Sequence, residues 1–471
     1  MKQNHRSKKE SFAPLKRSLG RQQGKMRIPI LSTLLFFWQW GNTATGTATP
    51  GATVTSSDDE VSISSMEYNS GDGYAAQDPM NIGAMLLDPA QSTARQRQEK
   101  AHLLKRMDRK SGKWGTTHPR YRLLEALFGF SKYRERNMAE LDRWRSLYKN
   151  VGKKQKQILE RVVQYTKKLD DIEELIYTNE VVCKSIVATA MQYYHITSRE
   201  LEDHVKEAEK AGRQADKTGV SQTLKHFVRD WADEGSKERD EAFPCILSTI
   251  SSLKDSSPGL KKVLLPGSGV GRLGHEIANL EGFEVTINEW SMFMNVGYRF
   301  IESQSAANAF TFYPFIDGMS HHAITEDMLR PLAAPNVAPN RDVLLVEGDF
   351  NTVLNDRKGH FDIIVTHYFI DTARNLMAYF ETIHRLLQPG GRWINFGPLL
   401  YGTGPFVQLS LEEIIAVVED MGFVFEDLSD ECGDLTFEDR KVRSKQSEYG
   451  FNRKALTRYA YLAQAWMVRK V

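Results

Sequence analysis

Three glycines on alternate positions, directly after a short apolar run, constrain the fold of this chain most strongly. Residues 263–265 are apolar, Gly267, Gly269 and Gly271 follow, and a helical pattern begins after them. Glycine permits tight turns with positive φ and close approach of a ligand, and the next helix offers unpaired N–H groups. The segment predicts a first parallel strand that ends in a loop for a nucleotide cofactor.

Further apolar runs end in side chains that suit such a cofactor. Residues 283–287 run into Glu289, at the place where doubly wound folds put a carboxylate that accepts hydrogen bonds from ribose hydroxyls. Residues 343–346 lead to Asp349 and Phe350, which suit an adenine amino group and ring face. Residues 361–365 lead to His367 and Asp371.

The rest of the pattern also alternates helices and strands. A helix is expected over 372–387, a turn at the Gln-Pro-Gly-Gly segment 388–391, a strand over 392–396 and a last strand over 458–468. This order predicts the α/β class, with a doubly wound, mostly parallel sheet.

The glycine spacing separates two cofactor classes. Nicotinamide dehydrogenases carry G-x-G-x-x-G, whereas positions 267–271 read G-x-G-x-G, with Gly274 in addition. The series of strand ends looks like a class I S-adenosylmethionine-dependent methyltransferase, whose cofactor carries a sulfonium and no pyrophosphate. That likeness implies a seven-stranded, Rossmann-like sheet.

Longer strings resemble one family within this class, the carnosine N-methyltransferases. They are Leu-Pro-Gly-Ser-Gly-Val-Gly-Arg-Leu (265–273), Asn-Glu-Trp-Ser (288–291), Gly-Asp-Phe (348–350), Phe-Ile-Asp-Thr-Ala (369–373), Trp-Ile-Asn-Phe-Gly-Pro-Leu-Leu-Tyr (393–401) and, upstream, Phe-Val-Arg-Asp-Trp (227–231). The resemblance extends from about residue 120 to residue 471. It implies an enzyme that transfers a methyl group from S-adenosylmethionine to nitrogen.

The resemblance also implies which residues contact the cofactor. Arg229 suits the cofactor carboxylate through paired hydrogen bonds, and its alternative is an ion pair with Asp230 or Asp233. The implied cofactor-binding set is His226, Arg229, Gly267, Gly269, Glu289, Asp349, Phe350 and His367.

The acceptor side is predicted around Asp371. The family places a substrate-binding aspartate in the same string, so Asp371 is the candidate for substrate contact or proton acceptance, with His367 as a second candidate base. The alternative is a capping role for Asp371 or Thr372 at the following helix. Tyr401, Gly402 and Tyr461 are expected to line the acceptor pocket.

Three positions depart from the family. Gly402 stands where the family carries a histidine that contacts the imidazole dipeptide, Arg374 replaces a histidine, and His226 replaces a glutamine. Loss of a buried polar partner costs discrimination between substrates.

These departures leave the acceptor open. The leading prediction is an amide or ring nitrogen of a peptide-derived fungal metabolite such as a dithiol diketopiperazine. An amide is a poor nucleophile and would need Asp371 or His367 as a base. The alternatives are carnosine or another histidyl peptide, and a catalytically silent binding protein with this fold.

Composition limits partners and compartment. The chain has 62 basic and 60 acidic residues, so no net field favours nucleic acid, and a small molecule or short peptide is the expected partner. Cys183, Cys245 and Cys432 are far apart and odd in number, which suggests reduced thiols, a cytoplasmic or nuclear setting and no metal site.

The chain is expected to have three parts. Residues 1–95 are predicted to be a low-complexity tail, 96–258 a helical subdomain and 259–471 the methyltransferase core. The tail has a basic lead and an apolar run (28–38) that resembles a signal peptide but is short for a membrane span, so membrane contact is disfavoured.

One apolar stripe predicts a long helix over residues 153–177. We expect the stripe to pack on the sheet, and a homodimer seam is the alternative. It comprises Ile158, Val162, Tyr165, Leu169, Ile172 and Ile176.

Overall fold

The computed structural model describes residues 92–254, 259–402 and 404–471. The basic lead, the apolar run 28–38 and the rest of the tail up to residue 91 lie outside the described residues. Among the described helices, none is long and apolar enough to cross a membrane.

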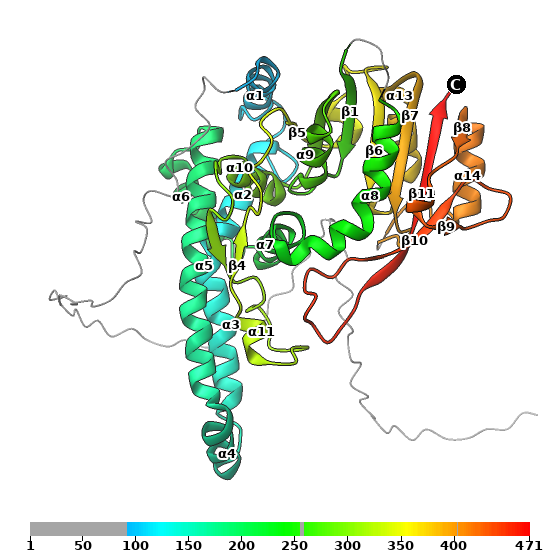
Figure 1. Cartoon of the computed structure of the whole chain (residues 1–471). Coiled ribbons are helices and arrows are strands. Elements are labelled where there is room, and N and C mark those ends of the chain that lie inside the picture. The colour runs from blue at the N-terminus through cyan, green and yellow to red at the C-terminus, as the bar shows by residue number, and fades with distance from the viewer. Residues whose placement is uncertain (1–91, 255–258, 403) are drawn as a thin grey trace, which may run out of the picture. The chain divides into compact units, whose positions relative to one another are not determined.

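The described part of the chain contains a nine-stranded sheet in the order β5-β2-β1-β6-β7-β11-β10-β9, with β8 paired to β11 (Figure 1). The pairings among β5, β2, β1, β6 and β7 are parallel, and the others are antiparallel. The predicted α/β class is confirmed. The strands are β1 (Lys261–Pro266), β2 (Phe283–Glu289), β5 (Leu344–Glu347), β6 (Phe361–His367), β7 (Leu387–Gly397), β8 (Phe423–Glu426), β9 (Asp434–Leu435), β10 (Arg443–Glu448) and β11 (Ala460–Lys470).

The sheet has two more strands than the predicted seven because β11 is long enough to pair twice along one edge. Its last residues, Met467–Lys470, pair with β8, and its first six, Ala460–Ala465, pair with β10. The short β9 then extends β10. The predicted turn at 388–391 lies within β7, where Gly390 has φ of 76°.

Alternation along the central strands gives the sheet two buried faces. In β1, Val263 and Leu265 pack with α8 (Ser236–Ser252) and α9 (Arg272–Asn279), whereas Leu264 packs on the other face. This period of two follows from the pleat of a strand. That other face is covered by α12 (Phe350–Val353), α13 (Leu376–Leu386) and α14 (Leu411–Asp420).

The N-terminal helices share a separate core with α10 (Met292–Glu302) and with a small two-stranded sheet, β3 (Phe310–Phe312) and β4 (Leu332–Ala334). Because this core mixes residues from both sides of position 259, the predicted boundary between subdomains stays a prediction. The remaining helices are α1 (Ala94–Arg106), α2 (Pro119–Ser131), α3 (Tyr133–Tyr148), α4 (Lys153–Val163), α5 (Tyr165–Tyr194), α6 (Ser198–Lys210), α7 (Lys217–Trp231), η2 (Asp233–Gly235), α11 (Thr325–Leu329), η3 (Ile370–Thr372) and η4 (Asp430–Cys432).

The prediction of one long helix over 153–177 is wrong. Gln164 adopts a left-handed conformation (φ 48°, ψ 52°) and separates α4 from α5. Ile158 and Val162, in α4, are 54% and 66% exposed, while Leu169 and Ile172, in α5, are buried. The stripe is therefore split, because only its α5 half turns toward the core.

The expectation of reduced thiols is also wrong for two of the three cysteines. Cys245 of α8 and Cys432 of η4 form a disulfide, and both are buried. They are 187 residues apart in sequence but adjacent because α8 packs against η4. Cys183 is a buried free thiol.

We expect the full chain to yield one alkylated cysteine when denatured without reductant and three with it. Reduction should lower the free energy of unfolding by about 2–5 kcal/mol, because the bond closes a long loop in the unfolded chain. Peptide mapping and urea unfolding would measure both effects. The Cys183→Ser variant is the control and should lose no stability on reduction beyond the wild-type loss; three alkylated cysteines without reductant would contradict the disulfide.

Candidate functional site

The loop from β1 to α9 adopts a conformation that requires glycine. Gly267, Gly269 and Gly271 have φ of 64°, 58° and 85°. A Cβ on Gly267 would lie 2.2 Å from the ring of Phe369, and one on Gly271 would lie 2.6 Å from the ring of Tyr298. The loop therefore combines positive φ with close packing, and no amino acid other than glycine satisfies both requirements.

Glu289, at the end of β2, holds this loop in place. Its Oε2 accepts a hydrogen bond from the N–H of Gly269 (2.9 Å), and its Oε1 accepts from Trp290 and Ser291 (both 2.7 Å). Burial raises the pKa of Glu289, and these backbone donors and Arg122 act in the opposite direction. Oε1 already accepts two hydrogen bonds, whereas Oε2 accepts one and keeps acceptor capacity for a ribose hydroxyl.

Arg122, in α2, joins the site although nothing in the local sequence marks it. Its guanidinium lies 3.8 Å from the centroid of the Trp290 ring and donates to the Trp290 carbonyl at 2.5 Å. Burial lowers the pKa of Arg122 to about 10, while Glu289 and Asp349 favour its charged form. The N-terminal helices thus bring a cation to the two predicted carboxylates.

Asp349 and Phe350 follow β5, next to β2 in the sheet. Asp349 caps α12, since its Oδ1 accepts from the N–H of Asn351 at 2.9 Å. The Phe350 ring is buried and meets the rings of Phe369 and Tyr379 edge-on. Their roles in adenine binding stay predictions.

On the other side of the loop, α7 supplies His226 and Arg229. A Cβ on Gly269 would lie 3.2 Å from His226 Nδ1 and 3.6 Å from Arg229 Nη2, so both side chains lie against the loop. Arg229 Nε and Nη2 donate to the carboxylate of Asp230 at 2.7 and 3.3 Å. The ion pair considered for Arg229 is therefore present, with the buried Asp230, and binding of a cofactor carboxylate by Arg229 stays a prediction.

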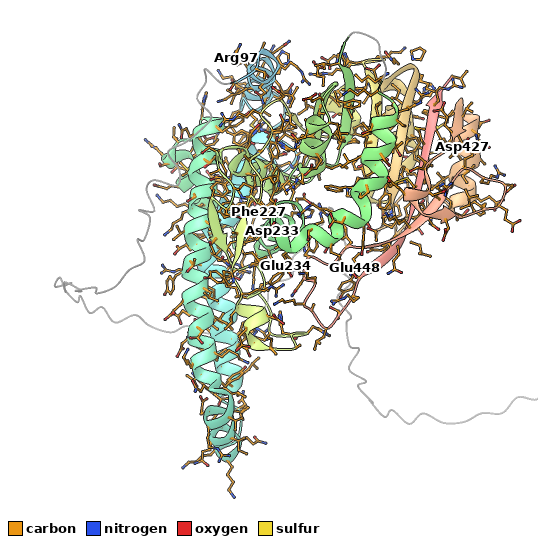
Figure 2. All side chains as sticks on the ribbon, in the orientation of Figure 1. Arg97, Phe227, Asp233, Glu234, Asp427 and Glu448 are labelled. Carbon is orange, nitrogen blue, oxygen red and sulfur yellow. A yellow bond between two sulfur atoms is a disulfide. The ribbon has the colours of Figure 1, made fainter. Side chains whose placement is uncertain are left out.

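Residues 449–452, a loop that the sequence analysis did not assign to the site, cover Arg229. The Tyr449 ring lies 4.8 Å from its guanidinium, and Glu238 of α8 accepts from the N–H groups of Gly450 and Phe451. Glu234 and Glu448, labelled in Figure 2, fix the neighbouring segments through Arg453 and Lys237. The Tyr-Gly-Phe-Asn sequence (449–452) before the last strand indicates a turn, but it does not indicate that the turn packs on Arg229.

His367 is the last residue of β6 and lies between the glycine loop and α8. Burial, and then Arg229, lower its pKa to about 3. Its Nε2 is buried and makes no hydrogen bond among the described residues. A ring with this pKa is a weak base, so His367 suits donation or acceptance of one hydrogen bond rather than proton abstraction.

Asp371 lies in η3, just past β6, and is only 6% exposed. Burial raises its pKa to about 7, although Oδ2 accepts from the N–H of Leu400 at 3.3 Å. Among the described residues, no Lys, Arg or His contributes to this pKa. The alternative capping role is wrong, because Asn375 caps α13 and the helix begins later than predicted, at Leu376.

The other predicted acceptor residues lie near this carboxylate. Burial raises the pKa of Tyr401 and of Tyr461, and the charge of Asp371 adds to both shifts. The Tyr401 hydroxyl donates to the carbonyl of Leu409, and Gly402 follows Tyr401 in the same half-buried segment. Tyr368, which the sequence did not single out, lies between His367 and Tyr461, with ring centroids 4.9 and 6.1 Å away.

These residues form two groups that meet at Tyr368. One group lies around the glycine loop and offers two carboxylates, an arginine and a buried histidine nitrogen. These groups could hold the ribose hydroxyls, the adenine amino group and the amino-acid end of S-adenosylmethionine. The other group surrounds Asp371. When bound, the cofactor supplies a methyl group on a sulfonium, and in-line alignment of the acceptor is the protein's main contribution.

A separate groove lies among the N-terminal helices. It has a volume of about 720 Å³ and is lined by residues of α1, α2, α5 and α6 and of the segment before α2, including Trp114, Arg120 and Glu200. None of the predicted site residues lines it.

We expect Glu289→Gln to weaken binding of S-adenosylmethionine at least about 100-fold, because the amide turns an N–H donor toward N–H groups that Glu289 accepts from. Titration calorimetry would measure this. Glu284→Gln, in the same strand and half-exposed beside Arg95, is the matched control. Equal affinities of both variants would contradict the role of Glu289.

Comparison with known proteins identifies the family. A family model described as carnosine N-methyltransferase matches residues 206–471. The carnosine N-methyltransferase of Mus musculus is 32% identical over 321 residues, 65% of this chain and 76% of the mouse protein. That of Schizosaccharomyces pombe is 34% identical over 276 residues, 53% of this chain and 70% of the yeast protein.

Solved structures add little to the identification of the family. A putative S-adenosyl-L-methionine-dependent methyltransferase of Methanococcus maripaludis is 14% identical, covers 53% of this chain and 91% of its own, and has a TM-score of 0.28. We draw nothing from so low a score. The match to the family model, which spans more than half of the chain, shows that the chain belongs to the carnosine N-methyltransferase family and is an S-adenosylmethionine-dependent N-methyltransferase.

Proposed function

We propose that this enzyme methylates an imidazole nitrogen of carnosine or of another histidyl peptide. The observation that carries the proposal is the buried carboxylate of Asp371, beyond β6, with no cationic partner among the described residues. A carboxylate in this state gains from a ligand that brings an N–H donor or a positive charge. An imidazole provides the donor at once and acquires the charge during methylation.

Asp371 would act by orienting the ring. Its carboxylate accepts the hydrogen bond of one imidazole N–H, which leaves the other nitrogen with a free lone pair for the methyl group. As that nitrogen forms its new bond, the ring becomes an imidazolium, and Asp371 lies against the developing charge. This interaction grows toward the transition state, as catalysis requires.

The same residues argue against an amide acceptor. An amide nitrogen has to lose its proton to become a useful nucleophile, and the two candidate bases are poor ones for that step. His367 has a pKa of about 3, and Asp371 one of about 7. The comparisons likewise give no support to a fungal metabolite and favour the dipeptide, because the relatives carry the name carnosine N-methyltransferase.

The roles of the individual site residues belong to this proposal. Glu289 and Asp349 would bind the ribose and adenine, Arg229 and His226 the amino-acid end, and Tyr401, Gly402 and Tyr461 would border the acceptor. Gly402 removes one hydrogen-bonding side chain relative to the family, whereas Tyr401 and Tyr461, whose pKa values the charge of Asp371 helps to raise, keep polar rings near Asp371.

The substrate assignment is tested by supplying carnosine, other histidyl peptides and a diketopiperazine to the full chain with S-adenosylmethionine. We expect methylated carnosine, with NMR placing the new methyl on the ring. Methylation of the diketopiperazine without methylation of any histidyl peptide would overturn the proposal.

We expect Asp371→Asn to lower kcat/KM for the histidyl substrate at least about 100-fold and yet to stabilise the protein at pH 8. The folded pKa of Asp371 is raised to about 7, so the wild-type protein loses stability as the pH rises from about 4 to about 7, where the unfolded chain ionises this carboxyl more readily than the folded protein does. The variant escapes that cost, about 2–4 kcal/mol.

Urea unfolding at several pH values measures this difference, which should be full at pH 8 and vanish near pH 4. Asp420→Asn, at an exposed position, is the control and should change neither quantity. An Asp371→Asn variant that is both active and unchanged in stability would remove Asp371 from the site.

A further inference from the structure

Helix α4 forms an exposed cap on the hairpin of α3 and α5, at the end farthest from the sheet (Figure 1). It buries none of its eleven residues. Ile158 and Val162 are 54% and 66% exposed, and Leu147, where α3 ends, is 54% exposed. Because Lys154 and Arg161 lie four residues before and three after Ile158, they flank the apolar pair on the helix surface.

The charge of this segment is one-sided. Residues 149–163 contain one acidic residue and five basic ones, in a chain whose overall charge is only +2. Among the described residues, none of the five forms an ion pair, although Arg145 and Lys167 nearby do. The five are Lys149, Lys153, Lys154, Lys156 and Arg161.

The one acidic residue of this segment, Glu160, makes its hydrogen bonds within the cap. Its Oε1 accepts from the Tyr148 hydroxyl at 2.5 Å and from the Thr166 hydroxyl at 2.8 Å. The Tyr148 and Tyr165 rings pack 4.6 Å apart, and Lys156 donates to the carbonyl of Lys149. These contacts hold α4 on the hairpin and leave its outer face basic and aliphatic.

We propose that this face, made up of Leu147, Lys153, Lys154, Ile158, Arg161 and Val162, docks on an anionic lipid surface. Amphipathic helices with aliphatic side chains between Lys and Arg place the aliphatic groups among the acyl chains and the cations among anionic headgroups. The long stems of Lys and Arg allow both contacts at once.

Charge and composition favour this occupant over two others. A second copy of the chain would bring two strongly basic faces together, and like charges repel. A nucleic acid would neutralise the lysines but gain nothing from Ile158 and Val162, and the α4 face carries no aromatic side chain on which a base could stack.

The test is co-sedimentation of the full chain with vesicles of phosphatidylcholine, with and without phosphatidylserine. We expect binding only when phosphatidylserine is present, with a loss at high salt. Changing Lys153, Lys154 and Arg161 to Glu should reduce binding at least about tenfold. The matched control changes the exposed Lys105, Lys110 and Lys210 to Glu, which alters the net charge equally and should bind nearly as wild type.

A second variant separates lipid from other polyanions. Ile158→Gln with Val162→Gln keeps every charge and should still weaken vesicle binding. The basic N-terminal lead is common to all variants, so differences between them report on α4, and retained S-adenosylmethionine binding shows that each variant is folded. Equal binding of the two charge-reversal variants, dependence on RNA instead of vesicles, or self-association through this face would overturn the proposal.

Discussion

The hydrogen bonds of one buried carboxylate hold the centre of this molecule together. Glu289 accepts from the N–H of Gly269 in the loop after β1 and from Trp290 and Ser291 at the start of α10. The ends of β1, β2 and α10 are therefore fixed relative to one another by a single side chain. Burial raises the pKa of Glu289, and the three backbone donors offset part of that shift. The glycine loop needs this anchor, because glycines at positive φ have no side chains of their own to hold them.

A second buried carboxylate, on the neighbouring strand, ties the N-terminal helices to the same edge of the sheet. Glu347 of β5 accepts from Arg299 of α10 at 2.8 Å and from the Tyr194 hydroxyl of α5 at 2.9 Å. Removing one partner of such a buried set would leave an uncompensated charge, which is strongly destabilising. Since Arg122 of α2 also contacts Trp290 at this edge, the position of the helices and the shape of the cofactor site depend on each other.

The five parallel strands and the glycine loop could be predicted from sequence because each has a local signature, an apolar run with particular residues next to it. The features that were missed or predicted wrongly depend on distant partners. Arg122 meets Trp290 from 168 residues away, and Cys245 meets Cys432 across 187. The break at Gln164 was not predicted for another reason. The apolar spacing of the stripe continues across it, although only Leu169 and later residues of the stripe are buried in the core.

The disulfide fixes helix α8, which contacts the residues around Arg229. Helix α8 carries Cys245, and its earlier residues fix the covering loop and α7: Glu238 accepts from Gly450 and Phe451, and Arg239 donates to the carbonyl of Arg229. Fixing α8 to η4 therefore steadies the surroundings of Arg229 and His367. A buried carboxylate at Asp371 with no cationic partner among the described residues lowers the stability of the fold, and the covalent link between α8 and η4 offsets part of that loss.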